Sequence, residues 1–450
     1  MDAGFRIRSK LRGSIAAATV LLAACGDAGP AAPGIPDGDG PGGRPPGLEV
    51  PDPESGTGGE NAARWLDAPY VVLVSLDGFA SRYVEQYDPP ALQALAAGGV
   101  WAPEGMTPVY PSKTFPNHYA LATGMYPARN GIVANTFLDP VRGAWYSLGD
   151  LATVQDGSWY RGEPLWVTAE RQGMVAASFF WVGSEAAVAG VRPAYWREYD
   201  GRVPNDERVD QVLRWLTYPA EYRPHLVTLY FSTTDAVGHQ FGPDSPEMAQ
   251  AVASVDASLS RLFAGVEGLP HASQVALIVL SDHGMDHYAV SGRRYVADVV
   301  GLDGLIIPES GPAANVHVDE GIRSAEAVRD AVNAGLEGVT AYLASEVPDR
   351  FHYRGDPRIG DVVLMPDSGI VVYPANDRPE TSGWTHGWDN ALLSMRALFM
   401  ASGPGLPVAR EIDPFEAVHI YPLVTRILGL TAAGGIDGDA STWNGILGGN

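Results

Sequence analysis

The sequence is nearly without cysteine and lysine and is short of basic residues as a whole. Its single cysteine, Cys25, has no partner for an intramolecular disulfide, so the fold cannot depend on such bonds. Only two lysines occur, Lys10 and Lys113, and 30 basic residues stand against 53 acidic ones, giving a formal net charge of −23. This acidity excludes a broad basic face of the kind that binds nucleic acid. The 450 residues, 46% of them apolar, instead predict a large globular core.

The first 25 residues resemble a bacterial lipoprotein signal peptide. Four basic residues precede an apolar stretch at 15–24, which is too short to span a bilayer and ends in the lipobox-like Leu22-Ala23-Ala24-Cys25. In a lipobox the cysteine is lipidated; a buried free Cys25 is the alternative. Gly26 rather than aspartate follows it, which by known sorting rules permits the outer membrane. We therefore expect a lipid anchor in the bacterial cell envelope, on the periplasmic side or the outer membrane.

Residues 26–62 and 63–450 differ sharply in pattern. The first segment is rich in Gly, Pro and Asp and predicts a flexible tether. In the second, apolar runs typical of strands buried on both faces alternate with helical spacing, which predicts an α/β fold. The strand runs are 70–76, 225–231, 275–280 and 396–401, and the helical segments are 90–97, 246–262 and 414–428. The less regular stretch of about 293–380 is expected to be an inserted subdomain over the site.

Three of the predicted strands end in or lead to an aspartate: Asp77, Asp235 and Asp282. The carboxyl ends of parallel strands meet at one edge of a sheet, where ligands bind. Three histidines accompany them, His239, His283 and His386. Mixed carboxylate and imidazole ligands suit two cations such as Zn²⁺, and two such ions could clamp a phosphoryl group during in-line displacement.

A short run at residues 111–119 supplies a candidate nucleophile. Pro116 suits the first turn of a helix, which places Thr114 at or just before the helix start. There the free backbone N–H groups and the helix dipole favour an anion such as phosphate. An N-cap threonine is the alternative, but two adjacent metals would give the Thr114 hydroxyl a catalytic use.

Taken together, these motifs resemble the nucleotide pyrophosphatase/phosphodiesterase family of the alkaline phosphatase superfamily. The resemblance covers about residues 68–445, and its motifs occur in order at 110–119, 123–127, 131–132, 162–169, 180–184, 235–239, 281–285 and 386–390. It implies an alkaline-phosphatase-like α/β/α sandwich with a central, mostly parallel sheet and an inserted subdomain. It also implies a phosphoric diester hydrolase with two Zn²⁺ per chain.

The resemblance assigns the site residues one by one. One zinc would be bound by Asp77, Thr114, Asp282 and His283, and the other by Asp235, His239 and His386. Asn135 matches the position that donates to a non-bridging phosphate oxygen. Phe115 and Tyr199 match positions that sandwich a nucleobase, and Trp181 and Leu148 would line the same pocket; ordinary core packing is the alternative for the aromatic residues. His118 is expected to be a structural hydrogen-bonding residue, and Lys113 to point outward.

The expected reaction is attack by Thr114 on phosphorus through a covalent phosphothreonine intermediate, converting nucleotide diesters and triphosphates to nucleoside monophosphates. The partner is then a small nucleotide or phosphodiester substrate, and the protein is expected to be a monomer that meets the membrane only through its anchor. A phospholipase C-like enzyme acting on choline lipids or a phosphonate hydrolase of the same superfamily is the alternative. A binding protein without turnover would be expected to lack Thr114 or a ligand, and none is missing.

Overall fold

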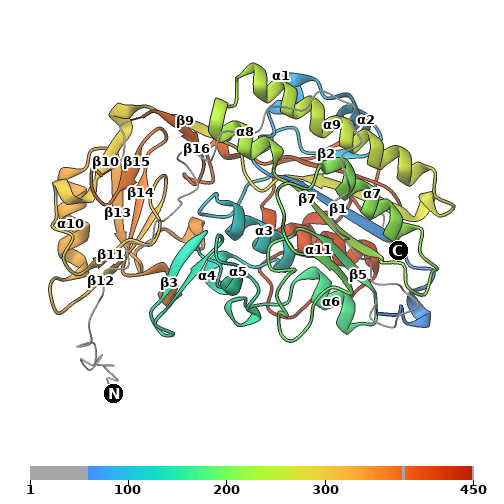
Figure 1. The fold of residues 1–450 in the computed structure, drawn as a ribbon, viewed down its shortest axis with the longest axis horizontal. Helices are drawn as coiled ribbons and strands as arrows, with labels where there is room; N and C mark the ends of the chain where they lie inside the picture. The colour runs from blue at the N-terminus through green and yellow to red at the C-terminus, as the bar shows by residue number, and fades with distance from the viewer. Residues whose placement is uncertain (1–58, 378–380, 448–450) are drawn as a thin grey trace. The chain divides into compact units, whose positions relative to one another are not determined.

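An eight-stranded sheet forms the middle of the fold in the computed structural model, which describes residues 59–377 and 381–447 (Figure 1). Neighbouring strands run parallel except at β17, which is antiparallel to both β8 and β2. The strands are, in order across the sheet, β18 (Arg410–Glu411), β2 (Val100–Trp101), β17 (Phe399–Ser402), β8 (Val275–Leu280), β1 (Tyr70–Leu76), β7 (Leu226–Phe231), β5 (Ala176–Phe179) and β6 (Tyr195–Arg197). The predicted α/β class with a mostly parallel sheet is confirmed.

Two apolar cores lie on opposite faces of this sheet. Along β1, Val71 and Leu73 belong to one core, and Val72 and Val74 to the other. This explains why the strand is apolar throughout, since each buried Val or Leu contributes about 1.5–3 kcal/mol. Helices cover both faces (Figure 1). On one side are α3 (Thr114–Thr123), α6 (Leu165–Arg171) and α11 (Ile420–Leu428), and on the other α1 (Tyr83–Tyr87), α2 (Pro90–Ala97), α7 (Asn205–Leu216) and α9 (Pro246–Glu267).

Most predicted elements are observed, with differences at their ends. The strands at 70–76 and 275–280 and the helix at 90–97 have the predicted bounds. The predicted strand at 396–401 is shorter, beginning at Phe399, and it is antiparallel. The helix predicted at 414–428 begins only at Ile420, after a 3₁₀ turn at Ala417–His419. Bounds are the least certain part of a pattern because apolar residues continue into the flanking turns.

The region expected as an insert contains a small core of its own. Its four-stranded sheet comprises β11 (Leu305–Ile306), β12 (Ala314–Val318), β14 (Val362–Pro366) and β13 (Val339–Leu343), and α10 (Ala325–Gly335) packs on it. The remaining elements are α4 (Pro127–Asn130), α5 (Leu151–Val154), α8 (Thr233–Phe241) and the strand pairs β3 (Thr136–Asp139) with β4 (Ala144–Ser147), β9 (Asp286–Tyr288) with β16 (Gly383–Thr385), and β10 (Arg293–Tyr295) with β15 (Val371–Tyr373).

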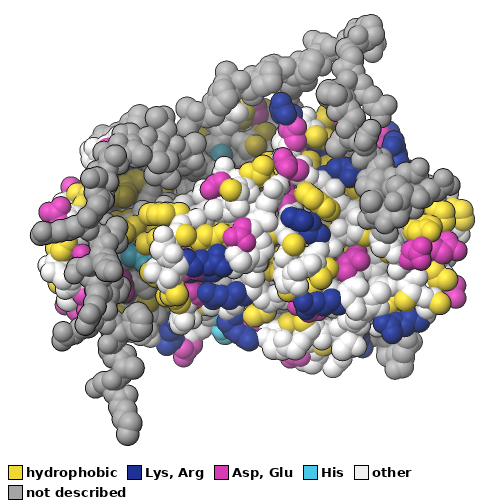
Figure 2. All heavy atoms as spheres, turned by 60° about the horizontal axis from the view of Figure 1, so that its bottom comes forward, with side chains coloured by type: hydrophobic (Ala, Val, Ile, Leu, Met, Phe, Trp, Pro, Cys, Tyr) yellow, Lys and Arg dark blue, Asp and Glu magenta, His cyan; other side chains and the backbone are white. Residues whose placement is uncertain are grey.

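The folded part begins earlier than position 63. Asn61, assigned above to the tether, is buried, and its side chain bonds the backbone of Ala220, Arg223 and Val175. The end of the predicted tether is therefore wrong by at least two residues. Cys25 and the predicted signal peptide lie outside the described residues. Within the described ranges, none of the helices has both the length and the apolar character needed to span a bilayer. On the face seen in Figure 2, basic and acidic side chains are interspersed.

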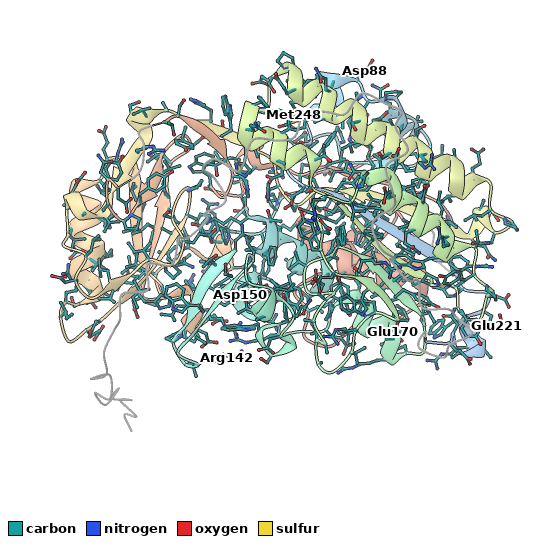
Figure 3. The ribbon with its side chains drawn as sticks, viewed as in Figure 1. Asp88, Arg142, Asp150, Glu170, Glu221 and Met248 are labelled. Atoms are coloured by element: carbon teal, nitrogen blue, oxygen red, sulfur yellow. The ribbon has the colours of Figure 1, made fainter. Side chains whose placement is uncertain are left out.

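Glu170, at the end of α6 (Figure 3), should make stability depend on pH. Its Oε1 atom accepts the backbone N–H groups of Ala176 at 2.8 Å and Ala194 at 2.9 Å, yet burial raises the pKa of the carboxyl to about 7. This lies above its ordinary value of 4.5, so the folded state binds an extra proton between those pH values. Stability therefore falls as pH rises from about 4.5 to about 7 and stays lower above it.

Glu170→Gln keeps an acceptor for both N–H groups and removes the buried charge. We expect the variant to be more stable than wild type at pH 8, by about 3 kcal/mol, and equal at pH 4. Urea unfolding at the two pH values measures this, with the exposed Glu267→Gln as control. An equal effect at both pH values would contradict the assignment.

Candidate active site

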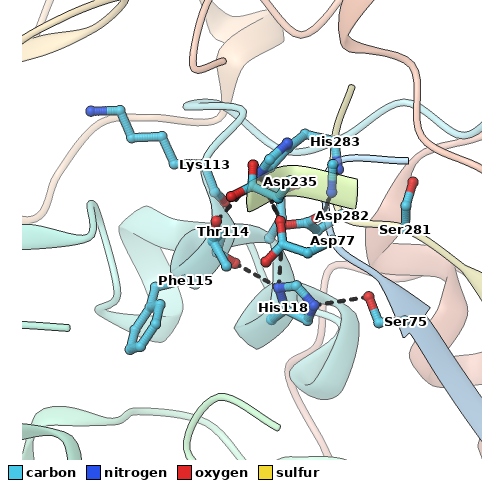
Figure 4. A network of polar contacts seen from close by, with 12 residues as sticks. Ser75, Asp77, Lys113, Thr114, Phe115, His118, Asp235, Ser281, Asp282 and His283 are labelled. Atoms are coloured by element: carbon cyan, nitrogen blue, oxygen red, sulfur yellow. Dashed lines mark hydrogen bonds and ion pairs between the residues drawn. The ribbon is translucent and has the colours of Figure 1, made fainter. Parts of the chain in front are cut away.

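Three carboxylates meet at the carboxyl ends of adjacent strands β8, β1 and β7. Asp77 directly follows β1, Asp282 follows β8 after Ser281, and Asp235 lies in the first turn of α8, just after β7. Figure 4 shows the three side chains close together. Gly78 allows this approach, because it has a φ of +66° and a Cβ there would lie 2.9 Å from the Cα of Asp235. The convergence predicted from the strand ends is observed.

With three histidines, these aspartates form two adjacent groups. In the first, His283 Nε2 lies 3.6 Å from Asp77 Oδ1 and 3.0 Å from Asp282 Oδ2. In the second, Asp235 Oδ1 lies 3.4 Å from His239 Nε2 and 3.6 Å from His386 Nε2. The rings of His283 and His386 stack with centroids 3.6 Å apart, so the groups share a border. The structure thus brings together all six Asp and His residues that the resemblance assigns to metal.

The donor atoms fit cations. The Nδ1 atoms of His239, His283 and His386 each face a backbone carbonyl oxygen at 2.8–2.9 Å, which requires a proton on Nδ1. Their Nε2 atoms therefore present lone pairs to the carboxylates when the rings are neutral. In agreement, the buried oxygens Asp77 Oδ1, Asp235 Oδ1 and Asp282 Oδ2 have no hydrogen-bond partner. Acceptor lone pairs that face one another in a buried site repel each other, and a cation bound between them would remove that repulsion.

The charges of the protein alone are poorly balanced here. Burial, followed by the charges of Asp282 and Asp235, raises the pKa of Asp77 well above its usual value. Burial and the nearby His283 and His239 lower the pKa of His386 well below its usual value, which keeps its imidazole neutral. Although burial opposes it, the charges of His283 and His118 lower the pKa of Asp282 well below its usual value. The raised pKa of Asp77 and the neutral His386 are the two features that a bound cation would suit.

Thr114 is the first residue of α3 and lies beside His283 of the first group. Lys113 is the N-cap, with extended backbone, so the N-cap alternative for Thr114 is wrong. The Thr114 hydroxyl lies 3.3 Å from His283 Nε2 (Figure 4). Asn135 approaches the same helix start, where its Oδ1 accepts the Phe115 N–H at 3.0 Å. That bond leaves the amide NH₂ as the end that could donate to a bound phosphate oxygen.

Comparison with known proteins decides the family. The model of the type I phosphodiesterase / nucleotide pyrophosphatase family matches residues 71–389. The chain belongs to this family. It is therefore a member of the alkaline phosphatase superfamily, as its motifs suggested.

Relatives of this phosphodiesterase family member are found among animal proteins. Venom phosphodiesterase CdcPDE of Crotalus durissus collilineatus is 35% identical over 392 residues, covering 84% of this chain and 46% of the relative. Human ectonucleotide pyrophosphatase/phosphodiesterase family member 1 is 35% identical over 385 residues, covering 82% and 41%. The chain thus spans a little under half the length of these curated relatives.

Solved structures of murine ectonucleotide pyrophosphatase/phosphodiesterase 5 are also similar. One matches with a TM-score of 0.79 and 28% identity, covering 84% of this chain and 100% of that chain. Another, of an inactive threonine-to-alanine variant in complex with AMP, matches with a TM-score of 0.80 and the same identity and coverage.

The predicted base-pocket residues of this family member differ in exposure. Phe115 is half-buried against Tyr146, whereas Tyr199 is 49% exposed and packs against Phe180. Leu148 is half-buried, and its N–H donates to the carbonyl of Asn135 at 3.0 Å. Trp181 is only 2% exposed, and its indole N–H donates to the His118 carbonyl. Trp181 therefore lies beneath the site as part of the core.

Several supporting residues escaped prediction or were predicted wrongly. Tyr230 donates its hydroxyl to Asp77 Oδ2 at 2.5 Å. His118 bonds the Thr114 carbonyl at 2.9 Å and Ser75 Oγ at 2.8 Å, which confirms its structural role. Lys113 was expected to point outward but is buried, with its Nζ 3.1 Å from Glu309 Oε1. No motif marks Tyr230 or Glu309, because their partners lie far away in the sequence.

Tyr230→Phe should weaken metal binding with little loss of fold. It removes the hydrogen bond that orients Asp77, and loss of such a contact to a metal ligand typically costs about 10–100-fold in affinity. Competition with a chromophoric chelator, with Zn²⁺ as the probe ion, measures the change. Thr228→Val is the control, since Thr228 lies on the same strand but bonds Ser178. Equal Zn²⁺ affinity in the two variants would contradict the assignment.

Proposed function

We propose that the chain is a two-zinc hydrolase that cleaves phosphodiester and pyrophosphate bonds of nucleotides and releases nucleoside monophosphates. The observation that carries the proposal is the Thr114 hydroxyl, 3.3 Å from His283 Nε2, at the border of two adjacent carboxylate–histidine groups. Family membership supports the reaction class, and the AMP held by the murine relative supports a nucleotide ligand.

The two groups would each hold one Zn²⁺. Asp77, Asp282 and His283, joined by the Thr114 hydroxyl, form one ligand set, and Asp235, His239 and His386 form the other. Mixed imidazole and carboxylate ligands at three or four per ion suit zinc. When bound, zinc would polarise phosphoryl oxygens and lower the pKa of a bound hydroxyl or water.

Thr114 is the proposed nucleophile. Its oxygen forms the bond to phosphorus as its hydroxyl proton is lost, and the bond from phosphorus to the leaving oxygen breaks. Water then displaces Thr114 from the phosphothreonine, which releases the nucleoside monophosphate. Two in-line displacements retain configuration at phosphorus. The murine threonine-to-alanine variant is inactive, which agrees with a catalytic threonine in this family.

Four residues would hold the substrate. The Asn135 NH₂ group would donate to a non-bridging phosphate oxygen, where negative charge grows in the transition state. The rings of Phe115 and the exposed Tyr199 would stack on the nucleobase, with Leu148 at the edge of the pocket. Trp181 is buried in the core and donates a hydrogen bond to the His118 carbonyl on α3. It therefore supports this helix rather than contacting the base.

Thr114→Ala should abolish turnover and spare binding. We expect hydrolysis of a p-nitrophenyl nucleotide diester to fall at least about 10³-fold, because the nucleophile is lost. AMP affinity should be unchanged and both zinc ions retained at saturating Zn²⁺, since each ion keeps three other ligands. Thr123→Ala is the control, since Thr123 lies on the same helix and its hydroxyl bonds the Tyr119 carbonyl. A wild-type panel of a nucleotide diester, ATP, a phosphate monoester and lysophosphatidylcholine, compared by kcat/KM, tests the substrate class. Preference for the choline lipid would overturn the nucleotide assignment.

We also propose that Cys25 is lipidated and anchors the protein in the bacterial cell envelope through the Gly-, Pro- and Asp-rich segment between Cys25 and Asn61. The basis is the lipobox-like sequence at 22–25, in residues outside the described ranges. In a bacterial host, labelled fatty acid should enter the wild-type protein, and Cys25→Ser should lose the label and leave the membrane fraction. Equal labelling of both forms would sink this proposal.

A further inference from the structure

Glu309 links the inserted region to the candidate active site through both of its carboxylate oxygens. It lies in the loop between β11 and β12. Its Oε1 pairs with Lys113 Nζ at 3.1 Å, and its Oε2 accepts the backbone N–H groups of Asn135 at 3.1 Å and Thr136 at 3.4 Å. One carboxylate therefore joins Lys113, the residue before Thr114, to Asn135, whose NH₂ group is the proposed hydrogen-bond donor to phosphate.

Lys113 fills a restricted site. Its side chain is 5% exposed, and its Nζ also lies 3.5 Å from the Ala313 carbonyl. A Cβ on Gly387, next to His386, would lie 3.1 Å from Lys113 Cε. The space around the Lys113 side chain is therefore closely filled. In a chain that has 30 basic residues and only two lysines, the buried basic residue beside Thr114 is a lysine. The pair is therefore a built contact with one geometry rather than a mobile surface ion pair.

Three contacts hold Asn135. Glu309 accepts the Asn135 backbone N–H at 3.1 Å, and the Asn135 carbonyl accepts the Leu148 N–H at 3.0 Å. The Asn135 side-chain oxygen accepts the Phe115 N–H at 3.0 Å, at the start of α3, which leaves the NH₂ end of the amide free. Without Glu309 the Asn135 backbone would keep, among the described residues, only its contact with Leu148, so the amide could move relative to the Thr114 oxygen.

We propose that Glu309 is a positioning residue for the reaction, which fixes the Asn135 amide relative to Thr114 through its contacts with Lys113 and the 135–136 backbone. The inference rests on the proposed roles of Thr114 and Asn135. Because the donor matters most in the transition state, Glu309 affects turnover more than ground-state binding.

The test compares Glu309→Ala and Glu309→Gln with Glu346→Gln in the full-length, zinc-loaded protein. Glu346 pairs with Arg329 in the same inserted region, at 3.1 Å, and is remote from the site residues in the contacts it makes. With a p-nitrophenyl nucleotide diester, Glu309→Ala should lose about 10–100-fold in kcat with KM within about threefold. Glu309→Gln should recover part of the loss, since its amide oxygen can still accept the Asn135 N–H. Glu346→Gln should match wild type.

A double-mutant cycle with Asn135→Ala separates positioning from general destabilisation. If Glu309 acts through Asn135, the double variant is no slower than Asn135→Ala alone. The inference would be overturned if the loss of kcat in the double variant equalled the product of the two single-variant losses. It would also be overturned if Glu309→Ala kept the kcat of wild type. Should Glu309→Ala lower Tm by more than about 10 °C, Glu309→Gln carries the same cycle. Inactive wild-type enzyme or an active Thr114→Ala would instead refute the proposed function, so the two failures are distinguishable.

Discussion

The arrangement of the site depends on three carboxylates placed together without a basic side chain of the Lys or Arg type. Within the described residues, Asp77, Asp235 and Asp282 form ion pairs with histidines only. Two other buried carboxylates are compensated: Asp139 pairs with Arg358 at 2.9 Å, and Asp256 accepts two backbone N–H groups at the start of α2. Asp282 Oδ1 likewise accepts the backbone N–H groups of Gly78 and His283. The buried oxygens Asp77 Oδ1, Asp235 Oδ1 and Asp282 Oδ2, in contrast, have no hydrogen-bond partner. Burial of charge without such compensation is costly, so these three oxygens mark the place where a cation is needed.

The sequence was sufficient for the three central strands of the sheet and for this constraint because both follow local rules. An apolar run buried on both faces predicts a parallel strand, and parallel strands bring their end residues to one edge, which located Asp77, Asp235 and Asp282. His386 lies in a loop without regular pattern, and only the motif resemblance assigned it. The short β5 and β6, the antiparallel direction of β17 and the burial of Lys113 have no local signal, since they depend on packing between distant segments.

The region of about 293–380, predicted to be an insert, is joined to the segment that follows α3 by several contacts, of which the Glu309 contact is one. Tyr353 donates its hydroxyl to the Val133 carbonyl at 2.8 Å. Arg358, 2% exposed, pairs with Asp139 and also donates to the Gly131 carbonyl at 2.8 Å. Residues 131–139, which include Asn135, are thus held by the insert along their length. A displacement of this region would therefore also move Asn135, the proposed hydrogen-bond donor to phosphate. The region thus helps to position the candidate active site.

Within the run at 111–119, most polar side chains make structural contacts, whereas the Thr114 hydroxyl faces the candidate metal ligands. Asn117 accepts the Val109 N–H at 2.7 Å and donates to the Lys113 carbonyl at 2.9 Å, which fixes the loop before the helix. Ser112 bonds the Trp388 carbonyl, His118 bonds the Thr114 carbonyl, and Lys113 pairs with Glu309. Each of these groups has a partner in the framework. The Thr114 hydroxyl instead faces His283, one of the candidate metal ligands. The contacts of the neighbouring residues fix the position of Thr114, and its oxygen remains available to attack the substrate.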